Sequence, residues 1–237
     1  MLRSFRFGEA DRVLHLYTRA NGRIGAVAKG VRKTTSRFGG RLEPFSHVEL
    51  VLHRGRGELE TVTGASLVRP HDRARTDPYR LQVGMIGLEA MLRLFTEQEA
   101  NERAFTALTR FLDALDDLPP RAPARPRHDA LVLSFQLKLL WLSGYLPHLG
   151  TCVECGTDED LVGFLPAAGG IVCSGCATHE AVAFDAQAAR AIDLLLRAPL
   201  AAAPAVELGE RVAVDLVSFV SAWYEHHGGF RLRTLAS

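Results

Sequence analysis

Alternating hydrophobic and polar positions run through residues 2–68 and predict short β-strands. In "RVLHLYT" (12–18) Leu14 and Leu16 fall on one face of an extended chain, and "HVELVLH" (47–53) shows the same period of two, which "LETV" (59–62) continues. Turn residues separate these runs, and Asn-Gly at 21–22 between two apolar stretches is typical of a hairpin. Strands this short and this closely spaced predict a small barrel, and a five-stranded OB-type barrel fits the size.

From residue 79 onward the hydrophobic period changes to three and four, which indicates amphipathic helices. Segments 79–95 and 102–118 both follow this spacing, and 186–198 and 210–227 supply two further helices. Segment 129–146 is apolar on most faces, which predicts the central helix of a bundle. The pattern therefore predicts an α+β protein of several domains.

The domain boundaries follow from these changes in the hydrophobic period and from the position of the cysteines. We expect an OB-type domain at 1–75, the first part of a helical domain at 76–150, a small module at 151–180 and the second part of the helical domain at 181–237. The small module is thus an insertion in the helical bundle.

The four cysteines of the chain all lie in that module, in the pattern C-x2-C-x17-C-x2-C. Each pair can present two thiolates to one ion, and the spacer can fold back as a hairpin, so the pattern predicts one structural zinc ion with a complete tetrahedral ligand set. The ligands would be Cys152, Cys155, Cys173 and Cys176. The alternatives are two disulfides or free buried thiols.

Charge is unevenly distributed along a chain whose formal net charge is only +1. Residues 1–80 hold 16 Lys and Arg against 8 Asp and Glu, and the rest of the chain is acidic. A basic domain on an acidic remainder favours contact with a polyanion.

The cations gather in "AVAKGVRKTTSRFGGRLEPF" (26–45). A strand ends at "RIGAVAKG" (23–30), and we expect "VRKTTSRFGGR" (31–41) to be a mobile loop that follows a phosphate backbone, with an aromatic ring stacking on a base. The alternative is a solvated loop that serves solubility. The candidate nucleic-acid-binding residues, including two that extend the surface beyond the loop, are Lys29, Arg32, Lys33, Arg37, Phe38, Arg41, Arg54 and Arg56.

The sequence gives no positive sign of catalysis. "GRGELE" (55–60) lacks the Lys-Ser/Thr pair of a phosphate-binding loop and leads into a strand, and no G-x-S-x-G motif occurs. His-Asp pairs at 71–72 and 128–129 keep a metal-dependent nuclease or phosphohydrolase open as a third hypothesis. We therefore expect a protein that is not an enzyme.

The hydropathy pattern also bears on the compartment. No run approaches the roughly 18 apolar residues that cross a bilayer, and the first residues, "MLRSFRFGEADR", have no apolar core of a signal peptide. We expect a cytoplasmic protein without a membrane partner.

Residues 7–50, "FGEADRVLHLYTRANGRIGAVAKGVRKTTSRFGGRLEPFSHVEL", resemble the RecO family of bacterial recombination mediators. The resemblance continues through "GYLPHLGTCVECG" (144–156) and "GGIVCSGC" (169–176), so it covers nearly the whole chain. It implies an N-terminal OB domain, a helical domain and a zinc module.

The resemblance also implies a function in DNA repair. Members of this family bind single- and double-stranded DNA, anneal complementary strands, and work with RecR to load RecA onto DNA covered by single-stranded-DNA-binding protein (SSB). Such a protein would be cytoplasmic and associated with the nucleoid. The alternative from the residues themselves is an RNA-binding or ribosome-associated OB module with a zinc ribbon.

Overall fold

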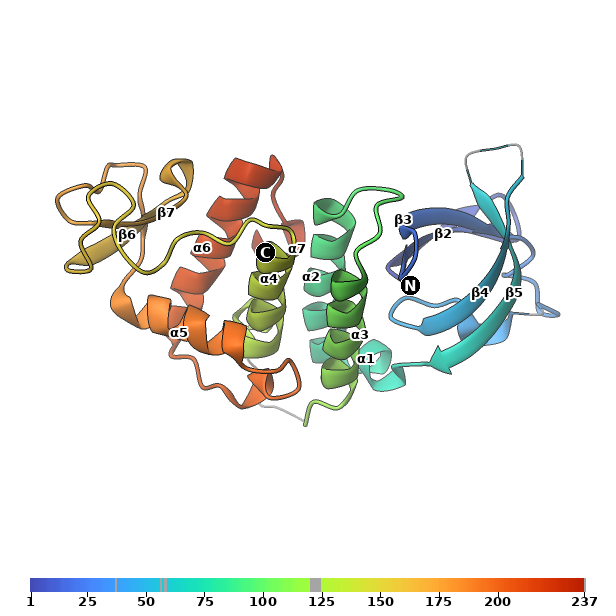
Figure 1. Ribbon diagram of the computed structural model, residues 1–237. Coiled ribbons are helices and arrows are strands. Elements are labelled where there is room, and N and C mark those ends of the chain that lie inside the picture. The colour runs from blue at the N-terminus through green and yellow to red at the C-terminus, as the bar shows by residue number, and fades with distance from the viewer. Residues whose placement is uncertain (37, 56, 58, 120–124, 237) are drawn as a thin grey trace.

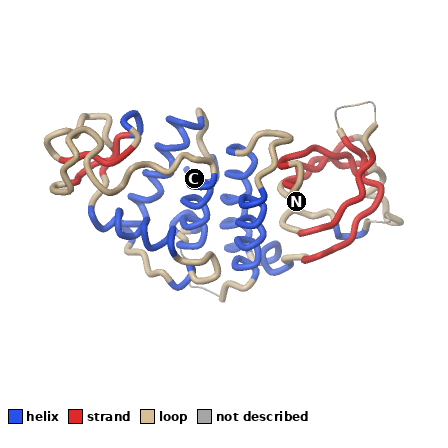
Figure 2. Tube along the Cα trace, viewed as in Figure 1, coloured by secondary structure: helices blue, strands red, loops and turns tan. Residues whose placement is uncertain are grey.

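A computed structural model describes residues 1–36, 38–55, 57, 59–119 and 125–236 of the chain. The molecule is elongated, with a β-barrel at one end, helices in the middle and a small sheet at the other end (Figure 1). Figure 2 shows the same division, with strands at the two ends and helices between them. The barrel and the four-cysteine module therefore lie on opposite sides of the helical domain.

The barrel contains five strands in the order β1-β2-β3-β5-β4. β3 and β5 pair in parallel, and the other neighbours pair antiparallel. This is an OB-like, partly open barrel, as the period of two predicted. Leu14, Leu16 and Ala26 point into its core. The strands are β1 (Arg3–Phe7), β2 (Asp11–Thr18), β3 (Gly22–Ala28), β4 (His47–His53) and β5 (Glu60–Arg69).

The predicted Asn-Gly hairpin joins β2 to β3 and also touches the helical domain. Gly22 has a φ of +60°, and a Cβ at this position would lie 1.9 Å from the carbonyl oxygen of Glu99. Two features therefore require glycine at this position, the left-handed backbone and the close approach of the loop that carries Glu99.

The helices form at the positions that the amphipathic pattern predicted. Side chains of Asp77, Asn101, Asp129 and Asp185 accept hydrogen bonds from the first backbone N–H groups of four of them, which fixes their starts. The helices are α1 (Asp72–Thr76), α2 (Pro78–Leu94), α3 (Glu102–Asp116), α4 (Ala130–Leu142), α5 (Ala186–Arg197), α6 (Glu210–Gly228) and α7 (Arg233–Ala236). α4 packs against α2, α3, α5 and α6, so it is the central helix.

The three-and-four spacing in segment 79–95 predicts a buried face that includes Leu81, Met85 and Leu88, and the observed buried face of α2 matches it only in part. Leu81 and Met85 are exposed, whereas Gly84 and Gly87 are buried. The ring of Phe45 packs on Gly84 and the ring of Phe111 on Gly87, so closely that a Cβ at either glycine would collide with them. Large rings from other segments thus turn the glycine face of α2 toward the core.

A buried histidine joins the barrel to the helical domain. His71 follows β5, and its ring nitrogens lie 2.9 Å from the Phe45 carbonyl oxygen and 2.8 Å from Oδ1 of Asp113. Arg69 pairs with the same carboxylate at 3.1 Å. The barrel and helix α3 are therefore tied at one carboxylate.

Replacement of His71 by alanine is expected to lower the free energy of unfolding by about 2–3 kcal/mol, because the buried Phe45 carbonyl group loses its partner. Chemical denaturation measures this change. His53, at the exposed end of β4, is the matched control, and its replacement by alanine should change stability by less than about 0.5 kcal/mol. Equal stability of the two variants would show that the His71 contacts do not hold the domains together.

The third part of the fold is a three-stranded sheet of β6 (Leu161–Leu165), β7 (Gly170–Cys173) and β8 (Val182–Ala183) in the order β7-β6-β8. β6 and β7 pair antiparallel, so the spacer between the cysteine pairs folds back as predicted. Phe164 lies against Phe219 and Trp223 of α6, with ring centroids 4.5 and 5.3 Å apart. This aromatic contact holds the module on the helical domain.

Candidate metal centre and nucleic-acid interface

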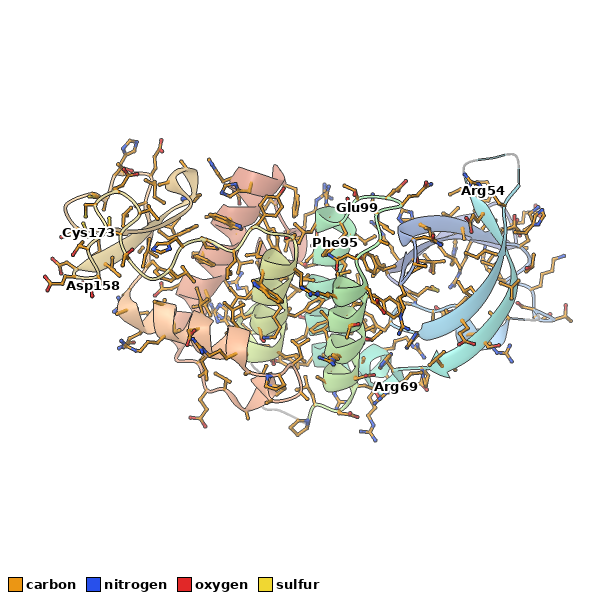
Figure 3. The ribbon with its side chains drawn as sticks, viewed as in Figure 1. Arg54, Arg69, Phe95, Glu99, Asp158 and Cys173 are labelled. Carbon is orange, nitrogen blue, oxygen red and sulfur yellow. The ribbon has the colours of Figure 1, made fainter. Side chains whose placement is uncertain are left out.

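The four cysteines come together at the end of the molecule farthest from the barrel (Figure 3, where Cys173 is labelled). Their Sγ atoms all lie within 4.8 Å of one another, and those of Cys155 and Cys173 are 3.7 Å apart. In a tetrahedral site with metal–sulfur bonds of about 2.3 Å, neighbouring sulfur atoms are about 3.8 Å apart. The cluster is therefore compatible with one tetrahedral metal ion.

The alternatives for the cysteines fit less well. The sulfur atoms of Cys155 and Cys173 are 3.7 Å apart, whereas a disulfide needs about 2 Å, and all four cysteines are free. The alternative of four free buried thiols also disagrees with the structure, because Cys155 is exposed and Cys176 is half-buried.

The backbone around Cys152 favours a thiolate. Burial raises the pKa of this thiol, but hydrogen bonds from the backbone N–H groups of residues 173, 155 and 154 outweigh it and lower the pKa to about 6. Gly156, with a φ of +79°, makes the tight turn after the pair, and its N–H donates to the Cys152 carbonyl at 2.8 Å. A thiolate is the form that binds a metal.

Most of the predicted nucleic-acid-binding cations lie on the surface of the barrel. Lys29, Arg32, Lys33, Arg41 and Arg54 are exposed, whereas Arg37 and Arg56 fall outside the described residues. Figure 3 shows Arg54 at the upper end of the barrel, just past the tip of β4. Within the part of the chain that the structure describes, Lys29, Arg32, Lys33 and Arg54 have no carboxylate at ion-pair distance. These cations can therefore meet an external anion.

The basic segment is held more firmly than a mobile loop would be. Gly30 turns the chain with a φ of +67°, and its N–H donates to the Asp11 carboxylate at 2.7 Å. Arg32 donates through its backbone N–H to the Ala10 carbonyl at 3.0 Å and through its guanidinium to the Glu9 carbonyl at 2.8 Å. The start of the segment is therefore anchored to the turn between β1 and β2.

Phe38 cannot serve as the predicted stacking residue in this structure. Its side chain is only 2% exposed and packs in the barrel core with Leu42 and Val62. An aromatic ring in a strongly basic segment anchors that segment to the core, because burial removes its apolar surface from water. The exposed aromatic rings of the barrel are instead Phe5 and Phe7 on β1, which the sequence reasoning missed.

Both His-Asp pairs have structural roles. His71 joins Phe45 to Asp113 in the domain junction. Asp129 caps α4 through the N–H of Leu131 and accepts a hydrogen bond from the Tyr79 hydroxyl at 2.7 Å. Neither pair gives support to the phosphohydrolase hypothesis, and among the described residues the four cysteines are the one cluster with metal-ligand spacing.

A wide groove of about 1090 Å³ runs between α3, α4 and the end of α5. Leu142, Leu196 and Trp141 give it an apolar floor, and the Trp141 side chain is 54% exposed. Arg103 and Arg110 stand on its α3 side. Both are exposed and have no ion-pair partner among the residues that the structure places. The groove thus combines apolar surface with available positive charge.

A half-buried lysine forms part of the same groove. Nζ of Lys138 donates to the carbonyl oxygens of Leu195 and Leu196 at 2.7 and 2.6 Å, which caps the C-terminus of α5. Burial lowers the pKa of this amine. Lys138 therefore shapes the groove, while Arg103 and Arg110 provide positive charge that has no ion-pair partner among the described residues. The acids that also line the groove are each paired with an arginine; they are Glu102, Asp113, Asp117 and Asp193.

Two family models cover almost the whole chain. Recombination protein O N terminal matches residues 1–71, and Recombination protein O C terminal matches residues 75–236. The chain belongs to the RecO family. The first match ends at His71, directly before helix α1, and the second begins at Arg75 within α1, so the boundary between them lies at the junction that His71 holds.

Relatives named DNA repair protein RecO resemble the chain over most of its length. One from Rubrobacter xylanophilus is 43% identical over 178 residues, which are 74% of this chain and 68% of that protein. One from Streptomyces avermitilis is 37% identical over 99% of this chain and 94% of its own length. One from a Nocardioides species is 34% identical over 96% and 93%.

Among the described residues, none of the helices combines the length and the apolar character needed to cross a bilayer.

Proposed function

We propose that this member of the RecO family is a non-enzymatic recombination mediator in DNA repair. It binds single- and double-stranded DNA through the barrel, anneals complementary strands, and acts with RecR to load RecA onto SSB-covered DNA at the nucleoid. The observation that carries the proposal is the exposed basic surface formed by Lys29, Arg32, Lys33 and Arg54 on an OB-like barrel.

Annealing needs two phosphate backbones to be neutralised while the base edges stay free to pair. Lysine and arginine side chains on an exposed surface do this without reading a sequence, and binding of this kind weakens steeply as salt rises. No step requires nucleotide hydrolysis, which agrees with the lack of a phosphate-binding loop motif in the sequence.

We propose that Cys152, Cys155, Cys173 and Cys176 hold one zinc ion in a structural role. Four thiolates without an oxygen ligand are the donor set typical of structural zinc, and they leave no position for a reacting group. When bound, the ion crosslinks the two cysteine pairs. The module lies at the opposite end of the molecule from the barrel (Figure 1), so the zinc supports the fold rather than the basic surface.

The direct test is annealing of complementary oligonucleotides coated with SSB, without ATP, over a series of salt concentrations. We expect acceleration that fades as salt rises, because the contacts are to phosphates. Competition between RNA and single-stranded DNA of equal length separates this function from the RNA-binding alternative. Absence of acceleration, together with a preference for RNA, would overturn the mediator function.

We also propose that the groove between α3 and α5 binds the tail of SSB, because the family resemblance implies that this contact needs an apolar pocket with basic neighbours. Arg103 and Arg110 are seven positions apart on α3, so they lie on one face of the helix beside the apolar floor. In such a pocket, acidic residues of the tail would meet these arginines, and apolar residues would contact Trp141 and Leu142.

Reversal of charge at Arg103 and Arg110 is expected to weaken binding of a fluorescent SSB tail peptide at least about tenfold, since two ion pairs are replaced by repulsion. Fluorescence anisotropy measures this affinity. Arg190→Glu, on an exposed part of α5, is the control and should bind normally. Full affinity in the double variant would place the tail elsewhere.

A further inference from the structure

Two exposed phenylalanines lie on the outer face of the barrel. Phe5 is 37% and Phe7 54% exposed, and both belong to β1. Because they are two positions apart in a strand, their rings point to the same side of the sheet. The guanidinium carbon of Arg3, on that side too, lies 4.3 Å from the centre of the Phe5 ring. The ring of His15 meets Phe5 edge-on at 5.3 Å.

The two ends of this outer face are covered differently. At one end Tyr17 packs on Phe95, with ring centroids 5.4 Å apart, and the guanidinium of Arg23 pairs with Glu97 at 3.4 Å. The loop between α2 and α3 therefore closes that end, as the positions of Phe95 and Glu99 in Figure 3 show. The end that carries Phe5 and Phe7 stays open.

The open end borders the basic segment. Phe7 pairs with Asp11 across the β1–β2 ladder, and Asp11 accepts the hydrogen bond from the N–H of Gly30. Lys29 precedes Gly30, and Arg32 and Lys33 follow it closely. The backbone and guanidinium contacts of Arg32 fix this segment against residues 10 and 9. Exposed rings and unpaired cations thus share one edge of the barrel.

We propose that Phe5 and Phe7 form a stacking platform for the bases of a single nucleic-acid strand, while Lys29, Arg32 and Lys33 bind its phosphates. Arg3 supports the Phe5 ring from the side. This inference rests on the proposed DNA-binding function. It specifies in addition the position of the bases on the barrel and a preference of the site for single-stranded DNA.

The spacing of the rings favours a single strand. Residues two apart in a β-strand are separated by about 7 Å, whereas bases in a duplex repeat every 3.4 Å and are stacked on one another. Side chains at this spacing can each receive one base of an extended strand, and they cannot enter an intact duplex stack. Base–aromatic stacking tolerates any sequence, which suits annealing.

The charge around the platform also suits a polyanion. Asp11 and Glu9 are the nearby acids, and Asp11 is engaged by the Gly30 N–H. Burial lowers the pKa of His15, and the positive charges of Arg23 and Arg3 lower it further against the opposing effect of Glu97. His15 is therefore neutral at pH 7, and the positive charge comes from arginine and lysine.

The first test uses Phe7→Trp, which places a fluorescent indole in the platform. Single-stranded oligodeoxythymidylate should quench this fluorescence strongly, and a duplex of equal length should quench it weakly. Val51→Trp is the matched control, because Val51 is an exposed apolar residue of another strand, β4, with 64% of its surface accessible. The signal of Trp141 and Trp223 is subtracted with the unmodified protein. Equal quenching by single strand and duplex would overturn the platform.

The second test is the double variant Phe5→Leu, Phe7→Leu, which keeps apolar side chains but removes the rings. Affinity for single-stranded DNA should fall at least about tenfold, duplex affinity should change less than about twofold, and the salt dependence should stay the same. Phe5→Tyr, Phe7→Tyr should restore single-strand binding. Thermal unfolding checks that both variants are folded.

The outcomes separate this inference from the proposed function. If the unmodified protein binds and anneals DNA while the leucine variant binds single strands equally well, the platform is refuted and the proposed function stands. If the unmodified protein binds no DNA, both are refuted. Loss of a protein partner from the leucine variant, with single-strand binding intact, would assign the rings to a protein interface instead.

Discussion

Replacement of Cys173 by serine is expected to release the metal ion and unfold the four-cysteine module. Among the described residues, the module's own buried hydrophobic cluster, apart from the side chains of β6 and β7 that join the core of the helical domain, consists of Cys152, Leu165, Val172 and Cys173. A core this small cannot offset the conformational entropy of the chain, so folding depends on the metal, which can contribute on the order of 10 kcal/mol in small zinc domains.

Two measurements test this prediction. Metal analysis should give about one zinc per chain in the unmodified protein and none in the variant. Hydrogen exchange should show loss of protection in β6 and β7. Ser174→Ala is the control within the module, since the exposed Ser174 hydroxyl only bonds the Asp160 carboxylate at 3.1 Å. A folded module in metal-free protein would refute the structural role of the ion.

DNA binding by the barrel should survive the loss of the module. The cysteines and the basic segment lie at opposite ends of the molecule, with the helices between them (Figure 1). If Cys173→Ser abolished DNA binding while the helices remained folded, the module itself would have to contact DNA.

The second large effect is expected from reversing the charge of Lys29, Arg32 and Lys33 together. Affinity for single-stranded DNA should fall at least about a hundredfold at low salt, and the slope of log affinity against log salt should become shallower by about 2, since each phosphate contact on a single strand contributes about 0.7. A salt titration of binding measured by fluorescence anisotropy gives both quantities.

A matched triple variant controls for the change in net charge. Arg73, Arg93 and Arg190 are exposed residues of the helical domain, and their replacement by glutamate alters the total charge equally. The affinity of this control for single-stranded DNA should stay within a few-fold of that of the unmodified protein. Equal losses in both triple variants would mean that the overall charge, rather than the basic segment, governs binding.

The elements of this protein could be predicted from local patterns because their causes are local. The helices at 102–118 and 186–198 begin after Asn101 and Asp185, whose side chains cap them as soon as the backbone turns. The strands alternate because one side of each faces a core. The cluster of four cysteines was predictable too, since two cysteine pairs on a hairpin bring four thiols together with little dependence on the rest of the fold.

Burial was less predictable, because it depends on segments far away along the chain. Leu81 and Met85 have the spacing of a core face, yet they are exposed, because rings of Phe45 and Phe111 pack on the glycines of α2. Phe38 lies among cations and is buried, whereas Phe5 and Phe7 alternate with polar residues and are exposed. Sequence alone could not say which aromatic rings would be exposed on the barrel.

Local patterns in the chain were enough to predict the period of each element, the grouping of the four cysteines and the excess of positive charge in the barrel. Long-range packing set which rings stay exposed beside that charge, where a groove with unpaired arginines opens, and that the four-cysteine cluster lies at the opposite end of the molecule from the barrel. The reason is physical. Backbone turns and ligand pairs form between near neighbours, whereas exposure and distance across the molecule are set by long-range packing.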